Sequence, residues 1–460
     1  GQYAFVPDAA TRHAGIGTIE FLAQRNNTFS YAPQKTWTMS STFELAAAGT
    51  NDYYSAGIPA AMGRCYGTTC AQAVIAYATG TSAVFGSNPT PTRASLKLDA
   101  GKVPTAVAVT NGGEFALVTV WDTNTLKGQV AVIALASSGV HNDWPADYPG
   151  LHNMGTYGFM KLLGYVDLPG MAAPTEISAT TGVQFESYHR IYPPTGGGAC
   201  SGTFVLQDAM PLNVEANRQT FMAGGCNYGN YAHGGVAVVV SKSEGKAAFI
   251  NLKPLFDYYQ SMYFGDIANF RQTANLGQAA NQWPYPFTAA PIQTPTVIKT
   301  VELGKRPTAV KVSLWVSNRA WIATEDGTLQ IYSLGNYASN GAASPGDIAL
   351  KGSGVVGKNP TALAYSKHDP QFGGDRLIVV SRGENKIDWV DLSGDGVRVL
   401  RTLQDSRLKD PVWAEDNDAH GTNSYVLTVA DHTGKQVSNY RYGPVIFTSN
   451  AGGACPGPSG

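Results

Sequence analysis

The chain has 460 residues, of which only 14% are charged, and 32 Lys and Arg against 33 Asp and Glu leave a formal net charge of −1. A typical soluble domain is about 25% charged, but no stretch approaches the roughly 18 to 20 uninterrupted apolar residues that a membrane-spanning helix needs. We therefore expect no transmembrane segment. Basic residues form no cluster that would attract a phosphate backbone, so we expect no nucleic-acid partner either.

The residue types favour strands over helices. Gly and Pro number 52 and 26, and 43% of the residues are hydrophobic, which is enough to supply a large core. Many Val, Thr, Tyr and Ile, with few of the Glu, Lys and Leu that fill helices, indicate short strands joined by tight turns. The expected fold class is all-β.

Residues 1–57 are predicted to be a non-repeat N-terminal arm with strands at 17–22 and 36–45. From residue 58 onward a unit recurs, and in its clear copies x-Pro-Thr-Ala is followed by alternating apolar residues. These entry strands are predicted at residues 103–109, 306–312 and 359–365. Alternation with a period of two is typical of a β-strand with one face toward the core.

Each clear copy continues with two further strands. The second strands are predicted at residues 114–120, 319–324 and 376–381, and the third strands at 129–135, 328–334 and 386–392. The turns between them carry residues that supply a positive φ or a preset bend, as in Asn111-Gly112-Gly113. The pattern predicts meander units of antiparallel sheet.

Weaker copies begin at Pro59, Pro174 and Pro411, and a further unit is needed between residues 204 and 252. Pro307, Pro360 and Pro411 are spaced by 53 and 51 residues, the pitch of a four-stranded propeller blade. We therefore predict a single β-propeller over residues 58–446, with seven blades and six or eight as neighbouring counts. A series of β-sandwiches would explain the strands but not the recurring entry.

The longer gaps between copies predict insertions at about residues 139–160, 183–202 and 253–300. We expect the N-terminal arm to pair beside the last blade and close the ring, which removes exposed sheet edges. Residues 447–460 are a Gly- and Pro-rich C-terminal tail.

The repeat resembles the YVTN-type β-propeller family, whose unit has a Pro-containing entry strand, a Tyr-Val-Thr-Asn-like strand and a Val-x-Val-Ile-Asp-like strand. Residues 115–120 with Asp122 and Asn124 match the second strand, and residues 387–392 match the third. The family includes surface-layer and secreted binding proteins, lactonase-like enzymes and subunits of redox enzymes. The resemblance therefore implies a fold rather than one function.

Five cysteines bear on the compartment. Cys65 and Cys70 have a spacing suited to a small disulfide loop, and Cys200 and Cys226 lie in Gly-rich surroundings that could close a second. Cys455 is then unpaired or joins subunits, and buried free thiols in a cytosolic protein are the alternative. The sequence opens at Gly1 instead of Met, which fits removal of a leader. We expect a secreted, extracellular or cell-surface protein.

Two short motifs imitate known sites. Residues 352–357 match G-x-G-x-x-G but join predicted strands and open no helix, so a turn is favoured over a dinucleotide site. Residues 198–202 have the outline of a nucleophile elbow with Cys200 in place of Ser, without the strand-to-helix context that the elbow requires. We therefore name no catalytic and no cofactor-binding residue.

Two residue groups are candidate metal ligands. In the insertion at 139–160, His141, His152 and Met154 combine imidazole with thioether, which suits copper; a packed cap rich in His and aromatic residues is the alternative. Residues Asp416, Asp418 and His420 imitate the start of a calcium loop, but Leu427 occupies the position of its bidentate Glu, so an Asx-rich turn is the alternative.

The favoured function is a non-catalytic propeller that binds or assembles at the cell surface or outside the cell, with itself or other surface proteins as partner. Few charges, 23 Tyr and non-repeat arms suit broad polar-aromatic contacts. A secreted or periplasmic enzyme, either a lactonase-like hydrolase or a metal or quinone oxidoreductase subunit, is the alternative. The ligand, the cysteine connectivity and the loops at the channel stay open.

Overall fold

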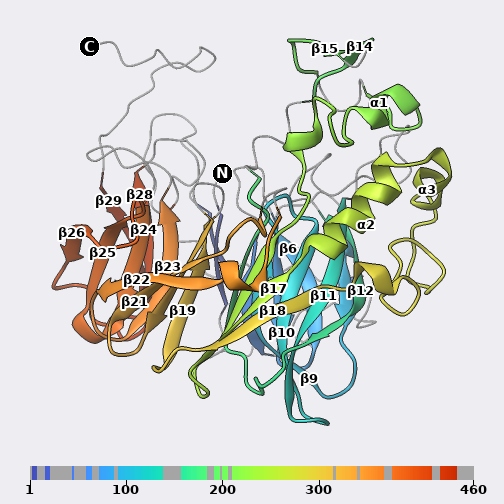
Figure 1. Cartoon of the computed structure of the whole chain (residues 1–460). Helices are drawn as coiled ribbons and strands as arrows, with labels where there is room; N and C mark the ends of the chain where they lie inside the picture. The colour runs from blue at the N-terminus through green and yellow to red at the C-terminus, as the bar shows by residue number, and fades with distance from the viewer. Residues whose placement is uncertain are drawn as a thin grey trace. The chain divides into compact units, whose positions relative to one another are not determined.

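The structure is a computed structural model of the whole chain (Figure 1). It describes residues 3–7, 16–20, 44–45, 58–64, 72–86, 92–137, 157–183, 191–196, 199–205, 210–313, 318–338, 342–366, 376–416 and 425–442. The chain divides into two compact units. Unit 1 comprises Gly1–Ile322 and Tyr332–Lys351, and unit 2 comprises Ala323–Ile331 and Gly352–Gly460.

The described strands form six successive antiparallel sheets, which are the blades of a β-propeller fold. Blade one consists of β4 (Pro59–Gly63), β5 (Gln72–Tyr77), β6 (Thr81–Gly86) and β8 (Ser95–Lys97). Blade two consists of β9 (Lys102–Val109), β10 (Phe115–Asp122), β11 (Lys127–Ser137) and β12 (Tyr157–Asp167). Blade three consists of β13 (Glu176–Thr180), β16 (Val236–Ser241), β17 (Lys246–Asn251) and β18 (Thr296–Glu302). Blade four consists of β19 (Pro307–Val312), β20 (Arg319–Thr324), β21 (Thr328–Ser333) and β22 (Ala349–Val355). Blade five consists of β23 (Pro360–Ser366), β24 (Arg376–Ser381), β25 (Lys386–Asp391) and β26 (Val399–Gln404). Blade six consists of β27 (Pro411–Asp416), β28 (Val426–Asp431) and β29 (Gln436–Arg441).

The repeat read from the sequence is confirmed as the blade unit. The predicted second strands at residues 319–324 and 376–381 coincide with β20 and β24, and each predicted third strand matches β11, β21 or β25 within a few residues. Gly113 in the turn before β10 has the positive φ (76°) that the turn requires.

The expected seven blades are not matched within the described residues, whose strands form six. The sequence assigned separate blades to the entry near Pro174 and to the strand pair near residues 234–252. In the structure β13 pairs directly with β16, with Ile177 opposite Val239, so the two segments belong to blade three. Residues 181–235 are an insertion between two neighbouring strands, which local alternation cannot distinguish from a blade boundary.

The insertions also differ in extent from those expected. The insertion placed at 183–202 runs from 181 to 235, and the one placed at 253–300 ends where β18 begins at Thr296. They contain three short helices, α1 (Glu215–Gln219), α2 (Lys253–Phe264) and α3 (Ile267–Gln272), in an otherwise strand-rich chain. Of the insertion placed at 139–160, residues 157–160 belong to β12 and the rest lies outside the described residues. Among the described helices, none has the length and apolar character needed to cross a bilayer.

The described strands of the N-terminal arm pair outside the last blade. Strand β1 (Tyr3–Pro7) pairs with β2 (Ile16–Glu20), and β3 (Glu44–Leu45) pairs in parallel with β7 (Thr92–Arg93). Ring closure by this arm therefore stays a prediction. The tail at residues 447–460 lies outside the described residues.

In three blades a carboxylate where the second strand turns into the third accepts hydrogen bonds from the backbone just before the first strand of the same blade. The Glu244 carboxylate accepts the N–H groups of Ala172 and Ala173 at 2.9 and 3.0 Å. In blade five Glu384 accepts from Lys358, and in blade six the Asp431 carboxylate accepts from residues 409 and 410. In these three blades the N–H groups stand just before the proline that opens the blade, so the acid fixes the chain where it enters the first strand.

Replacing Glu244 by Gln is expected to lower the free energy of unfolding by about 1 to 2 kcal/mol. Partial burial raises the pKa of Glu244, but the N–H groups of Ala173 and Ala172 and the hydroxyl of Ser241 outweigh it and hold the pKa below its ordinary value. A depressed carboxyl pKa stabilises the fold above the unfolded-state pKa, and this stability is lost as the pH falls through the folded-state pKa. Urea denaturation between pH 3 and 7 checks this: the difference between wild type and variant should shrink on acidification, and a pH-independent difference would contradict it.

The first four residues of the G-x-G-x-x-G motif lie in a strand instead of the expected turn. Gly352 and Gly354 lie in β22, and a Cβ on them would stand 2.0 Å from the Asp395 carbonyl oxygen and 2.5 Å from the Val397 Cβ. A Cβ on Gly357 would stand 2.4 Å from the Ser381 Cβ. Each glycine therefore admits a neighbouring segment, and the motif has a packing role.

Candidate functional site: the cap of blade three

Both insertions of blade three contribute to one structure, which we call the cap: residues 181–235, between β13 and β16, and residues 252–295, between β17 and β18. It contains α1 to α3 and the short hairpin of β14 (Pro194–Gly196) and β15 (Ala199–Cys200). Figure 1 shows these elements gathered at one end of the strands of unit 1. Large loops on a rigid sheet framework are where binding residues concentrate.

A cluster of five aromatic side chains, which we call the aromatic base of the cap, joins the cap to the blades. The ring of Phe115, at the start of β10, meets those of Phe256 and Tyr259 on α2 edge to face, with centroids 5.4 and 4.6 Å apart. The Trp283 ring lies 4.9 Å from that of Tyr259, and its indole N–H donates to the Tyr263 hydroxyl at 2.9 Å. All five side chains are buried. Such edge-to-face contacts stabilise beyond the apolar area that they bury, so the base holds α2 in one position.

A disulfide and a buried amide tie the projecting hairpin to the rest of the cap. Cys200 and Cys226 form the predicted disulfide, with Cα atoms 6.2 Å apart. Asn227, fully buried, accepts the Tyr192 N–H at 2.8 Å and donates to the Tyr192 carbonyl at 2.9 Å. Its amide also donates to the Thr220 hydroxyl at 2.8 Å. The side chain of Asn227 therefore pairs with the chain entering the hairpin as a strand would.

Replacing both Cys200 and Cys226 by Ser should open the hairpin locally. The residues of β14 and β15 are exposed or half-buried, so little apolar burial replaces the lost cross-link, while Asn227 keeps its anchor. We expect amide exchange over residues 191–205 to accelerate at least about tenfold, with exchange in β16 and β17 unchanged as the internal control. Equal exchange in wild type and variant would show that the disulfide does not hold the hairpin.

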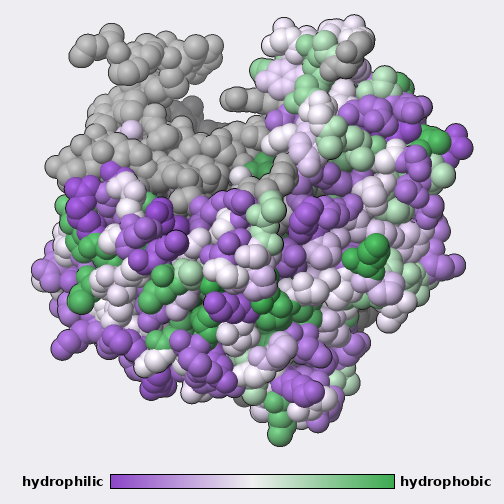
Figure 2. All heavy atoms as spheres, viewed as in Figure 1, coloured by the Kyte–Doolittle hydropathy of each residue, from purple (hydrophilic) through white to green (hydrophobic). Residues whose placement is uncertain are grey.

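Three apolar side chains of the cap are exposed to solvent. Phe204 is 54% exposed, Val214 44% and Ile292 78%. On the face of the molecule in Figure 2, hydrophobic residues of unit 1 form small patches separated by hydrophilic ones. Exposed aromatic and aliphatic side chains on an anchored framework suit recognition of another protein surface.

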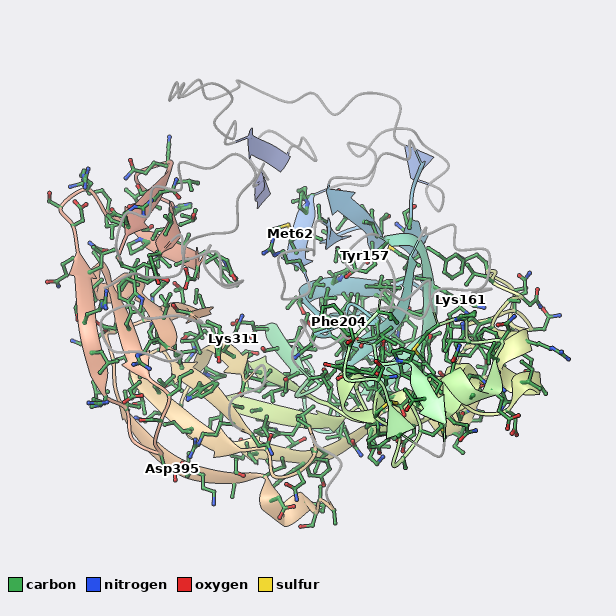
Figure 3. All side chains as sticks on the ribbon, turned by 90° about the horizontal axis from the view of Figure 1, so that it is seen from above. Met62, Tyr157, Lys161, Phe204, Lys311 and Asp395 are labelled. Carbon is green, nitrogen blue, oxygen red and sulfur yellow. A yellow bond between two sulfur atoms is a disulfide. The ribbon has the colours of Figure 1, made fainter. Side chains whose placement is uncertain are left out.

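Lys161 of β12 fastens the loop that follows α3. Its ammonium donates to the carbonyl oxygens of Gly277, Ala279 and Gln282, each at 2.8 Å, and the side chain is 3% exposed. Burial lowers the pKa of Lys161 to about 8. Figure 3 labels Lys161 beside the segment that returns from the helices. One buried cation thus satisfies three carbonyls of one loop.

The same loop covers the outer edge of β12. The Phe287 N–H donates to the Leu163 carbonyl at 2.7 Å, and the Gln278 amide donates to the Met160 carbonyl at 2.8 Å. Covering an edge strand with a loop prevents its pairing with another chain. This part of the cap therefore protects the edge of blade two.

His233 also lies within the cap. It is 6% exposed, its Nε2 lies 2.5 Å from the Tyr228 carbonyl oxygen, and its ring centroid is 3.6 Å from that of Tyr228. Burial lowers the pKa of His233, so the neutral imidazole donates to a backbone carbonyl. These contacts give His233 a structural role.

The predicted metal ligands are largely outside the described part of the chain. His141, His152 and Met154 fall there, as do Asp418 and His420. Asp416 is described: it is buried at the end of β27 and accepts a hydrogen bond from the Tyr442 hydroxyl at 2.7 Å. Within the described residues, no group of three or more His, Cys, Asp or Glu side chains could hold a metal ion. Both metal sites stay predictions.

The cysteine predictions divide in the same way. Cys65, Cys70 and Cys455 lie outside the described residues, so the first predicted bridge is untested. Because the Cys200 sulfur is bonded to Cys226, it is not a nucleophile in this structure. The outline of a nucleophile elbow at residues 198–202 therefore has no chemical counterpart.

Two residues that define the cap were not identified from the sequence. Lys161 contacts carbonyls more than a hundred positions further along the chain, and Asn227 pairs with a segment 35 residues before it. Neither belongs to a motif. A Lys in the middle of an apolar strand is the one local signal that could have singled out Lys161, because such a charge is buried only with partners.

Comparison with known proteins leaves the chain without a family. No family model matches it, and no curated protein matches its sequence. Among solved structures it is similar to a crystal structure of BBS1N in complex with ARL6DN, with 10% identity and a TM-score of 0.39 over 81% of this chain and 74% of that chain. That similarity says nothing about what this chain binds. The class is defined by its own sheets: a β-propeller of six described blades, with a disulfide-tied cap on the third.

Proposed function

We propose that this chain is an exported, non-catalytic β-propeller that binds and assembles at the cell surface or outside the cell. Its partners are further copies of itself, as in a filament or surface layer, or other surface proteins. The observation that carries the proposal is the cap, which is anchored by an aromatic base and a disulfide and presents Phe204 and Val214 to solvent.

The disulfide supports the exported location. Disulfides persist in oxidising compartments and are rare where thiols are kept reduced. Cys226 is exposed and Cys200 is half-buried, so a reducing cytosol would have access to the bond. The low charge content, 14%, suits a protein whose surface is partly covered by neighbours.

Light scattering after size-exclusion chromatography, with electron microscopy of the native material, tests the assembly. We expect particles larger than one chain, growing with concentration. A strictly monomeric particle at high concentration would contradict self-assembly.

A charge placed on the cap tests whether this surface makes the contact. Phe204→Asp should weaken partner binding or self-association at least about tenfold, because a desolvated carboxylate would replace an apolar anchor. Thr203→Asp adds the same charge at the neighbouring exposed position and should have a much smaller effect. Equal effects of the two variants would show that charge alone, and not the Phe204 contact, controls binding.

Elemental analysis and absorption spectroscopy of the purified protein test the absence of catalysis by a bound group. We expect no stoichiometric metal or quinone. One equivalent of either per chain would overturn the non-catalytic proposal in favour of an oxidoreductase subunit.

A further inference from the structure

The two insertions that form the cap join blade three at one place. The first insertion returns to the sheet at the start of β16, and the second leaves it at the end of β17, the strand paired with β16. The Leu252 N–H donates to the Gly235 carbonyl at 2.9 Å, so the two connections run side by side. We call residues 232–235 and 252–253 the stem of the cap.

His233 lies inside the stem, where both insertions contact it. From the first insertion, the Tyr228 carbonyl oxygen lies 2.5 Å from the imidazole Nε2, and the Tyr228 ring packs on the imidazole. From the second insertion, two side chains of α2 bind carbonyls of the stem. The Gln260 amide donates to the Ala232 carbonyl at 2.7 Å, and the Lys253 ammonium donates to the His233 carbonyl at 3.5 Å. The attachment of the first insertion to the start of α2 therefore depends on His233 and its neighbours.

The surroundings of His233 fit a neutral imidazole and not a charged one. The proton on Nε2 is donated to the Tyr228 carbonyl, so acid adds a second proton at Nδ1. Two charged side chains act on this position, both from α2: Lys253, which repels an imidazolium, and Asp257, which attracts it. The Asp257 carboxylate already binds Lys253 at 2.6 Å. The other neighbours, Tyr228 and Tyr337 beside Gly234, carry phenols, which are uncharged at acidic pH.

The balance of these contacts favours the neutral form. Burial lowers the pKa of His233 and Lys253 lowers it further, and together they outweigh the Tyr228 carbonyl, the Gln260 amide and Asp257, which raise it. The pKa of His233 is therefore below its ordinary value of 6.5. Below pH 6.5 the unfolded stem binds a proton more readily than the folded stem. The stability that His233 contributes is complete above the unfolded-state pKa and is lost as the pH falls through the folded-state pKa.

We propose that His233 is an acid-sensitive switch in the stem: protonation of its imidazole releases residues 228–233 from α2 and loosens the first insertion of the cap. Histidine is the side chain whose charge ordinarily changes between pH 5 and 8, and a buried charge without its own partner is costly. The release is local, because Arg218 still donates to the Gly265 carbonyl at the far end of α2. The switch belongs to the cap whichever partner the cap binds, so it does not depend on the function proposed above.

Hydrogen exchange of the full chain tests the switch. From pH 7.5 to pH 5 we expect the protection of residues 228–235, corrected for the intrinsic exchange rate, to fall at least about fivefold. The protection of β11 should stay unchanged and serves as the internal control. His233→Gln keeps an N–H donor for the Tyr228 carbonyl but cannot be charged, so its protection should not depend on pH. Wild type that keeps its protection at pH 5, or an equal loss in wild type and variant, would overturn the proposal.

Two charge variants on α2 give an answer that does not depend on the fold of His233→Gln. Lys253→Gln removes a repulsion and should move the midpoint of the loss to higher pH, whereas Asp257→Asn removes an attraction and should move it to lower pH. Both shifts should be a few tenths of a pH unit, because the two side chains are exposed and screened. An NMR titration of isotopically labelled histidine in wild type measures the pKa of His233 directly, and we expect it below 6.5. Midpoints that do not move in opposite directions, or a pKa of His233 at or above its ordinary value, would overturn the switch.

Discussion

Replacing Lys161 by Met should lower the free energy of unfolding by about 3 to 5 kcal/mol. The buried ammonium donates to three carbonyl oxygens between residues 277 and 282, and a thioether leaves all three without their donor in an apolar setting. Lys97→Met is the matched control, because Lys97 is exposed and donates at the surface to the Thr79 carbonyl. Chemical denaturation of both variants measures the effect.

The pH dependence of the same variant checks the cause. Burial lowers the pKa of Lys161 from 10.5 to about 8, so between pH 8 and 10.5 the unfolded chain binds more protons than the folded chain. The contribution of Lys161 therefore makes the fold more stable as the pH rises through this window. Tyrosine side chains also titrate in this range of pH. The quantity to compare is therefore the difference in unfolding free energy between wild type and Lys161→Met.

We expect that difference to grow from pH 7.5 to pH 10, on the order of 1 to 3 kcal/mol. A difference that stays constant would show that the ammonium is not desolvated. A difference below about 1 kcal/mol at every pH would show that water replaces the lysine at the loop.

Replacing Gly352 by Ala should cost about 2 to 4 kcal/mol. An added Cβ would stand 2.0 Å from the Asp395 carbonyl oxygen, and because this neighbour is backbone the turn before β26 must shift as a whole. The expected result is a lower denaturation midpoint with an unchanged denaturant slope.

Gly396→Ala is the matched control for this substitution. Gly396 lies in the same turn, and a Cβ there would meet no atom within 4 Å, so its effect should stay within about 0.5 kcal/mol. Equal stability of Gly352→Ala and Gly396→Ala would contradict the close approach of this turn to β22, and with it the packing role of the G-x-G-x-x-G motif.

The strands were predictable because their signal is local. In β9, β19 and β23 the x-Pro-Thr-Ala entry is followed by alternating apolar residues, and the side-chain period of a strand acts over neighbouring positions. The carboxylates that bind the residues before the first strands of blades three, five and six were not predicted. Glu244 meets residues about 70 positions before it, so its role depends on the sheet and not on its neighbours in sequence.

The candidate site was predictable only in part. The Cys200–Cys226 disulfide followed from the Gly-rich setting of the two cysteines and is confirmed. The cap was underestimated, because α1 lies where the sequence predicted a further blade and α2 and α3 lie in a segment predicted only as an insertion. Asn227 is one of many Asn residues in the sequence, and only the approach of Tyr192 gives its amide a role.

Sequence alone determined the class of this protein and the unit from which it is built, since alternation, turn residues and repeat spacing report contacts close along the chain. Tertiary structure decided the number of described blades, because pairing of β13 with β16 across residues 181–235 depends on which strand edges meet. It also decided what holds the cap, where Lys161 and Asn227 act on distant segments. The low fraction of charged residues agrees with sheets whose inner strands are buried on both faces. In β16, for example, all six residues are buried.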